Sequence, residues 1–105
     1  MSLSGKRVGV LVEDGFEDLE LLYPVLRLQE EGVEVLVIGR EDREYRGKIG
    51  YCVRPDKLVG AVRAEELDGL VIPGGKAPEA LRLDERVLEL VKGVFEAGKP
   101  VAAIC

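Results

Sequence analysis

Three residues of this sequence are of types that can do chemistry together: Cys105, Glu17 and Gly75. Cys105 ends the apolar run 100–105 (PVAAIC), which begins with a proline and is typical of a parallel strand buried on both faces. The nucleophile of many α/β hydrolases stands where such a strand turns sharply into a helix. The alternative is a buried structural cysteine, because cysteine is one of the residue types most often found inside proteins.

A cysteine hydrolase needs a thiolate, a base or an orienting acid, and N–H groups that stabilise the negative charge developing on the substrate oxygen. In this scheme Cys105 supplies the sulfur, Glu17 a carboxylic acid that hydrogen-bonds to it, and Gly75 an unobstructed backbone N–H. Both partners also have simpler explanations: Glu17 would favour the dipole of the following helix, and Gly75 would permit a tight turn. The sequence contains no histidine, so histidine-dependent chemistry would have to take that residue from outside these 105 residues.

Four apolar runs predict the strands that position these residues, at 6–12, 33–38, 68–72 and 101–104. Helices are predicted over 17–31 and from the N-cap Asp84 to Gly98, with a single helical turn over 63–67. This alternation predicts a parallel sheet with helices on both faces. The segment 40–62 interrupts it, and its β-like pieces at 44–46 and 51–54 predict a small hairpin excursion.

Each of the two longer helices has one apolar face, which we expect to be buried. In the first, Pro24 is expected to kink the helix or to start its regular part near Tyr23. Cys52, in the excursion, is expected to serve packing only. The expected buried residues are Leu19, Leu22, Val25, Leu26 and Leu28 in the first helix and Val87, Leu88, Leu90, Val91 and Val94 in the second.

The loops that carry Glu17 and Gly75 and the end of the Cys105 strand should meet at one edge of the sheet, where the carboxyl ends of parallel strands lie together. Ligands of open α/β sheets bind at that edge. We therefore expect Glu17 to lie close to Cys105, and the Gly75 N–H to point at a site beside the sulfur. The strand 70–72 should pair with the strand 101–104 or lie one strand away.

Length and composition exclude several classes of function. The chain has 105 residues, enough for one small domain, and a net charge of −5 without a long basic run, so nucleic acid and anionic membranes are not expected partners. No apolar run approaches the roughly 18 residues that a membrane span needs. The first residues contain no long apolar region before a cleavage site, so secretion is not expected. The spacing of the two cysteines is not that of a disulfide framework, which predicts free thiols in the cytoplasm. We predict no cofactor and no bound metal.

Four motifs together resemble one known family: 13–20 (EDGFEDLE), 23–24 (YP), 73–79 (PGGKAPE) and 98–105 (GKPVAAIC). In these motifs the chain is similar to the PfpI-type intracellular cysteine proteases of the class I glutamine amidotransferase-like superfamily. That family also includes glyoxalase-III-like enzymes, proposed deglycases and chaperone-like members. The resemblance implies a flavodoxin-like three-layer sandwich with a mostly parallel central sheet.

Carried over residue by residue, the resemblance implies that Cys105 is the nucleophile, Glu17 the acid on its thiol and Gly75 an oxyanion-hole donor. Family members carry a histidine directly after the cysteine, so we expect residues 1–105 to be the N-terminal part of a single domain of this superfamily. The resemblance also implies a homo-oligomer, either a dimer or a hexamer. The excursion 40–62 is the expected contact surface, because it leaves the central sheet.

The function expected from these features is a cysteine-dependent hydrolase, a protease or amidase that acts on peptides. A glyoxalase-III-like or deglycase enzyme acting on small aldehydes is the second candidate, and the residues do not choose between the two. A non-enzymatic stress protein, either a holdase or an oxidation sensor, is the third, since a redox sensor also needs an accessible reactive cysteine. Residues 1–105 alone would be an inactive fragment, because half of the oxyanion hole would be absent.

Overall fold

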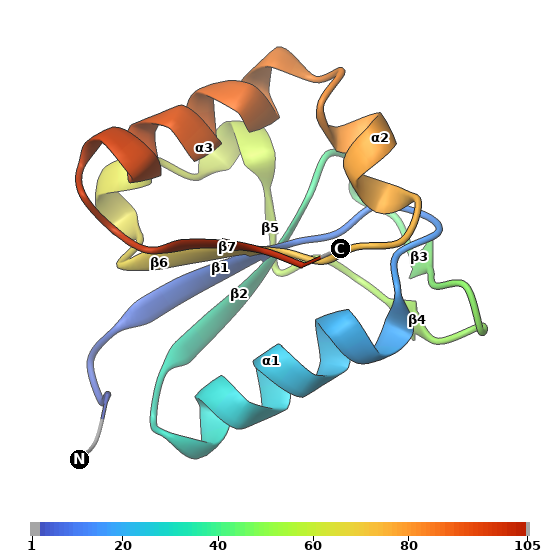
Figure 1. Cartoon of the computed structure of the whole chain (residues 1–105), viewed down its shortest axis with the longest axis horizontal. Coiled ribbons are helices and arrows are strands. Elements are labelled where there is room, and N and C mark those ends of the chain that lie inside the picture. Colours follow the sequence, from blue (N-terminus) through green and yellow to red (C-terminus); the bar gives the residue numbers. More distant parts are fainter. Residues whose placement is uncertain (1–2, 105) are drawn as a thin grey trace.

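A parallel sheet forms the centre of the fold (Figure 1). The computed structural model describes residues 3–104, and within them the sheet has five strands in the order β5-β2-β1-β6-β7, with every neighbouring pair parallel. The strands are β1 (Arg7–Leu11), β2 (Glu34–Gly39), β5 (Lys57–Leu58), β6 (Gly69–Ile72) and β7 (Val101–Ala103). β6 pairs with β7, as expected for the strands that precede Gly75 and Cys105.

Helices cover both faces of this sheet, α1 on one face and α2 and α3 on the other (Figure 1). Their bounds are α1 Asp18–Glu30, α2 Ala77–Leu81 and α3 Glu85–Glu96, with 3-10 turns at Val59–Ala61 and Ala64–Glu66. The core lies where the apolar side chains of the helices meet those of the strands. The predicted three-layer α/β fold is therefore confirmed. The sequence does not predict α2, because its five residues are too few for a helical period to show.

Helix α1 begins at Asp18 and continues past Pro24 to Glu30, so the expectation that its regular part begins near Tyr23 is wrong. The first turn is already closed ahead of the proline, because the carbonyl of Glu17 accepts the N–H groups of Glu20 and Leu21. Leu21 is the apolar residue of α1 that is fully buried. Leu19 and Leu26 are exposed, so their expected burial is wrong. The reason is that the helix packs on β2 through another face.

Helix α3 begins where the sequence predicts. The side chain of Asp84 accepts the N–H of Arg86 at 2.9 Å and caps the helix. Hydrogen bonds from the Arg86 side chain lower the pKa of Asp84 to about 2. Of the expected apolar stripe, Val87, Leu90 and Val94 are buried. Leu88 is 49% exposed, because it stands beside this stripe and not within it.

The predicted excursion forms an antiparallel hairpin of β3 (Tyr45–Arg46) and β4 (Cys52–Val53). Cys52 is a free cysteine on this hairpin and is exposed, which contradicts the expectation that its side chain serves packing. The reason is that β4 belongs to a separate two-stranded sheet and leaves the Cys52 side chain outside the core.

Strand β7 stands at the end of the sheet. Ala102 and Ala103 are exposed in the described part of the chain, which contradicts the expected burial on both faces. The reason is that β7 is an edge strand of the described sheet and pairs there with β6 alone, so its short alanine side chains have no neighbouring strand on the other side.

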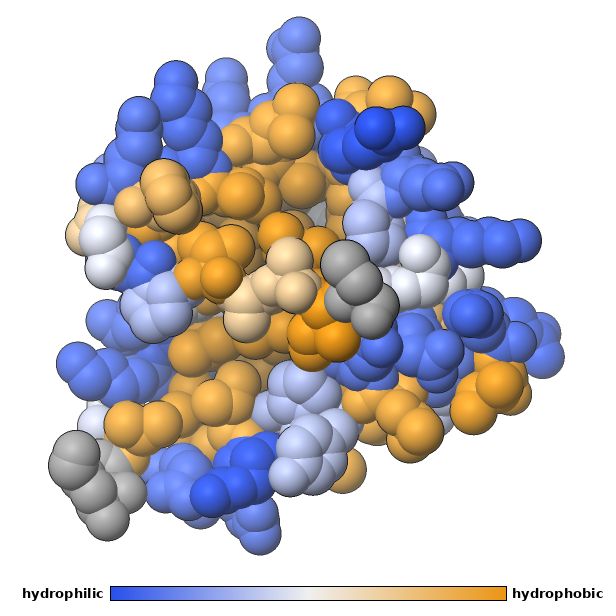
Figure 2. All heavy atoms as spheres, in the orientation of Figure 1, coloured by the Kyte–Doolittle hydropathy of each residue, from blue (hydrophilic) through white to orange (hydrophobic). Residues whose placement is uncertain are grey.

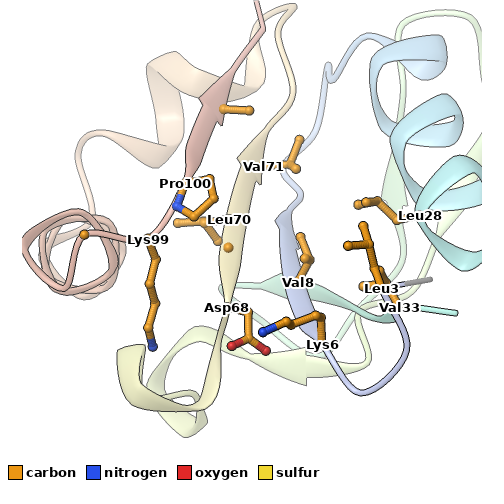
Figure 3. A pocket seen from close by; sticks show the side chains of 13 residues that line it. Leu3, Lys6, Val8, Leu28, Val33, Asp68, Leu70, Val71, Lys99 and Pro100 are labelled. Atoms are coloured by element: carbon orange, nitrogen blue, oxygen red, sulfur yellow. The ribbon is translucent and has the colours of Figure 1, made fainter. Parts of the chain in front are cut away.

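An apolar groove of about 550 Å³ opens on the face that α1 leaves uncovered. Figure 2 shows hydrophobic side chains gathered between α1 and α3, where β7 lies. Figure 3 shows Val8, Leu28 and Leu70 among the side chains that line the groove. Asp68 and Lys99, also in the lining, precede β6 and β7. The groove therefore reaches toward the amino ends of the strands, away from the edge where the site residues are predicted.

Candidate active site

Two loops at the carboxyl edge of the sheet are joined directly. The segment 15–17 follows β1, and the turn 74–76 follows β6, and the two form an antiparallel bridge at Phe16 and Gly75. The Glu17 N–H donates to the Gly74 carbonyl at 3.1 Å, and the Lys76 N–H donates to the Gly15 carbonyl at 2.9 Å. The sequence-based expectation that the loops carrying Glu17 and Gly75 meet at one edge agrees with this geometry.

Gly75 has a backbone conformation that glycine alone adopts readily, with φ at +83°. A side chain at this position would collide with the segment 15–17, because its Cβ would lie 2.5 Å from the Gly15 carbonyl oxygen. Since the bridge uses the neighbouring N–H groups, the Gly75 N–H donates to no acceptor within residues 3–104. A free N–H at the carboxyl ends of parallel strands is what an oxyanion donor requires.

Glu20 is the acid that reaches the end of β7, and the sequence analysis does not single it out. Its Oε1 accepts the Gly74 N–H at 2.9 Å. A Cβ placed on Gly74 would collide with this same Oε1 and would lie 2.5 Å from the carbonyl oxygen of Ile104. The Glu20 carboxylate therefore stands beside the residue that precedes Cys105. Cys105 itself lies outside the described residues.

Glu17, the acid predicted from the sequence, is paired with a cation. Its Oε2 lies 3.6 Å from the Lys48 Nζ, and its side chain is 30% exposed. The role of Glu17 as the acid on the thiol stays a prediction, because the position of the sulfur is not described. Among residues 3–104, the carboxylate that accepts a hydrogen bond from the turn 74–76 is that of Glu20.

The buried carboxylate of Glu13 is the centre of an ion-pair network at the start of the loop after β1. Glu13 is 3% exposed and contacts two arginines, Arg40 at 2.6 Å and Arg43 at 3.1 Å. Arg43 also pairs with Asp14 at 3.0 Å and lies over the Tyr45 ring at 4.0 Å. Because a buried carboxylate needs such partners, this network holds the chain rigidly just before the segment 15–17.

Residues 3–104 contain neither a metal-binding cluster nor a membrane-spanning helix. No group of three or more histidine, cysteine, aspartate or glutamate side chains is arranged there to hold a metal ion. No helix in the same range is long and apolar enough to cross a membrane.

Comparison with known proteins gives consistent matches. A deglycase of Thermococcus kodakarensis is 50% identical over 99 residues, which are 94% of this chain and 60% of that protein. A candidate cysteine protease of Bacillus subtilis is 45% identical over 101 residues, which are 95% of this chain and 60% of that protein. The solved structure of oxidized DJ-1 from Toxoplasma gondii matches with a TM-score of 0.89 at 35% identity, covering 96% of this chain and 56% of that one.

The chain thus spans about 60% of the length of the curated relatives that it matches. Residues 6–105 match the DJ-1/PfpI family. From this match and from the shared fold, the chain belongs to the DJ-1/PfpI family.

Proposed function

We propose that the protein is a cysteine-dependent hydrolase of the deglycase type, with Cys105 as nucleophile, Gly75 as oxyanion donor and Glu20 as the acid beside the thiol. The observation that carries the proposal is the free N–H of Gly75 at the carboxyl edge of the sheet. The preceding residue, Gly74, donates its N–H to the Glu20 carboxylate and lies close to the Ile104 carbonyl. The similarity to a deglycase supports the choice of reaction. A peptidase is the second candidate, favoured by the similarity to a candidate cysteine protease.

The first chemical step is the same for both substrates. The Cys105 thiolate adds to a carbonyl carbon, a C–S bond forms, and the electron pair of the C=O bond moves to oxygen, where the Gly75 N–H stabilises the charge. With an amide, collapse of this adduct expels the amine, which takes a proton. Water then hydrolyses the thioester, releases the acid and returns the thiol. The adduct of a 2-oxoaldehyde and an amine undergoes the same addition once its amine has left with the hydroxyl proton and the aldehyde C=O bond has re-formed. The oxygen of the resulting thiohemiacetal occupies the same position. Proton transfer from C1 to C2 then gives the thioester of a 2-hydroxy acid, which water hydrolyses to return the thiol.

Iodoacetamide should inactivate the protein in proportion to the fraction of Cys105 that it alkylates, because the thiolate is both the nucleophile and the target. The experiment is best done in a Cys52→Ser background, since Cys52 is a second free thiol. Loss of some hydration at the thiol and the negative charge of Glu44 raise the pKa of Cys52, which makes this exposed thiol a slow competitor. Labelling is measured by mass spectrometry, and turnover by release of amine from a methylglyoxal–amine adduct and by cleavage of a peptide.

The outcomes separate the candidate functions. Full turnover after complete alkylation of Cys105 would sink the proposal. Cleavage of the peptide without release of amine from the adduct would replace the deglycase by the peptidase. Rapid oxidation of Cys105 with no turnover of either substrate would favour an oxidation sensor. Suppression of client aggregation that alkylation leaves intact would favour a holdase.

We also propose that the protein is a homo-oligomer, a dimer or a hexamer. Large apolar side chains stand exposed on α1 and on the hairpin turn, namely Leu19, Tyr23, Leu26 and Ile49. Burying them between copies would be favourable at about 25 cal/mol per Å² of apolar surface. Sedimentation at micromolar concentration is expected to give a multiple of the monomer mass, and a run with monomer alone would refute the proposal.

A further inference from the structure

The hairpin and the turn that carries Gly75 are linked by a ladder of hydrogen bonds. On one side of the segment 15–17, the Gly15 N–H donates to the Arg46 carbonyl and the Lys48 N–H donates to the Phe16 carbonyl, both at 2.9 Å. On the other side lies the bridge to the turn 74–76. Three segments that are far apart in sequence therefore lie side by side, in the order 46–48, 15–17 and 74–76. Figure 1 shows the hairpin at the same end of the sheet as the start of α1.

The outer segment of this ladder is held by a buried carboxylate. Asp18 is 1% exposed and accepts the N–H of Ile49 at 2.9 Å and the N–H of Tyr51 at 2.8 Å. Burial by itself would raise the pKa of Asp18, but hydrogen bonds from Ile49, Tyr51 and neighbouring backbone N–H groups outweigh it and hold the pKa below its usual range. Asp18 is thus a buried charge that the proposed chemistry does not use.

The turn Gly47–Tyr51 lies directly on this carboxylate. A Cβ on Gly47 would lie 2.5 Å from the Asp18 Cγ, so the residue at 47 has to be glycine for the turn to come this close. The Gly47 N–H donates to the Tyr51 carbonyl at 2.9 Å and closes the turn. The side chain of Ile49 is 76% exposed, so the turn is fixed through its backbone and not through burial of that side chain.

We propose that Asp18 is a positioning residue for the Gly75 N–H. Its carboxylate fixes the turn 47–51, and this turn holds the segment 15–17. The segment 15–17 then holds the turn 74–76. This inference rests on the proposed function, because it assumes that the Gly75 N–H stabilises an oxyanion. Asp18 contacts none of the proposed reacting groups in the described structure. It acts through two intervening segments, and the hairpin becomes part of the support of the site.

A merely structural role for Asp18 makes a different prediction. If the carboxylate only stabilises the fold, its loss should lower the melting temperature and leave kcat per folded molecule intact. If it positions the oxyanion donor, kcat should fall in the folded variant, because misplacing a group by about 1 Å can cost a rate factor of about 100. Alkylation of Cys105 by iodoacetamide should change little, since that reaction forms no oxyanion at a carbonyl.

The experiment compares three variants of the protein with the wild type. Asp18→Asn keeps one carbonyl oxygen as an acceptor but presents an amide donor to the second N–H, and Gly47→Ala pushes the turn away from the same carboxylate. Asp56→Asn is the matched control, because Asp56 also accepts a backbone N–H, from Val37 at 2.8 Å, but stands at the β2–β5 edge of the sheet. For each variant, kcat, KM, the alkylation rate and the melting temperature are measured.

We expect Asp18→Asn and Gly47→Ala to lower kcat about 10- to 100-fold with the alkylation rate nearly unchanged. Asp56→Asn should lower only the melting temperature. Unchanged kcat in folded Asp18→Asn, or in folded Gly47→Ala where the first variant fails to fold, would overturn the inference while the proposed function stands. If the wild type turns over neither an adduct nor a peptide, the proposed function itself is refuted, and the inference that rests on it is refuted with it.

Discussion

Replacement of Gly75 by alanine is expected to destabilise the protein by about 3 kcal/mol or more and to remove most of the turnover of the molecules that still fold. A side chain at φ +83° is strained by itself. The new Cβ would also lie 2.5 Å from the Gly15 carbonyl oxygen and 2.7 Å from the Glu17 nitrogen. Both groups are hydrogen-bonded to the turn 74–76, so relieving the collision has to break the bridge and displace the Gly75 N–H.

Gly98→Ala is the matched control for this prediction. Gly98 also has a positive φ, +75°, but a Cβ there would meet nothing within 4 Å. The two variants share the conformational cost, and the difference between their free energies of unfolding, measured with urea, isolates the collision at Gly75. Equal losses of unfolding free energy in the two variants would contradict the predicted collision at Gly75. Full turnover in a folded Gly75→Ala variant would remove this residue from the mechanism.

The sequence is enough to predict most of the fold, because the signals are local. Apolar runs predict the strands β1, β2, β6 and β7, and Asp84 predicts the start of α3. The exposure of Leu19 and Ala102 cannot be predicted from the residues that surround them in the sequence. It depends on which part of the sheet α1 covers, and no residue of α1 or β7 reports that by itself.

The site is harder to predict from the sequence than the fold, for a similar reason. Gly75 follows from a double glycine after a strand, and the structure gives it a positive φ and a free N–H. Glu17 and Glu20 are harder to separate, since residues three apart on a helix share one side. Glu17, however, is the N-cap and has an extended backbone, while Glu20 stands in the first turn. Their side chains therefore leave in different directions, one to Lys48 and one to Gly74.

The support from the hairpin could not be predicted at all. Asp18 follows Glu17 in an acidic stretch, where an aspartate is normally solvated. Its burial depends on contacts with Ile49 and Tyr51, which are 31 and 33 residues away in the sequence. Such long-range hydrogen bonds leave no periodic pattern that a sequence analysis could detect.

The two acids can be told apart by matched isosteric changes. Glu20→Gln should lower kcat/KM about 100- to 1,000-fold, because it removes the ionisable group that stands beside the residue preceding Cys105. Glutamine keeps a carbonyl oxygen that can accept the Gly74 N–H, so the turn 74–76 and the melting temperature should change little. Glu17→Gln should cost less than about tenfold, since it loses a partly exposed ion pair with Lys48, and such pairs contribute about 0–1 kcal/mol.

A pH profile of kcat/KM adds a readout that a change in packing would not move. Loss of an acid that exchanges a proton with the thiol should alter the limb of the profile that reports the thiolate, in Glu20→Gln and not in Glu17→Gln. The reverse result, with Glu17→Gln inactive and Glu20→Gln close to wild type, would restore the assignment made from the sequence. The hydrogen bond from Gly74 to Glu20 would then serve only to shape the turn, and the lysine at position 48 would hold the catalytic acid in place.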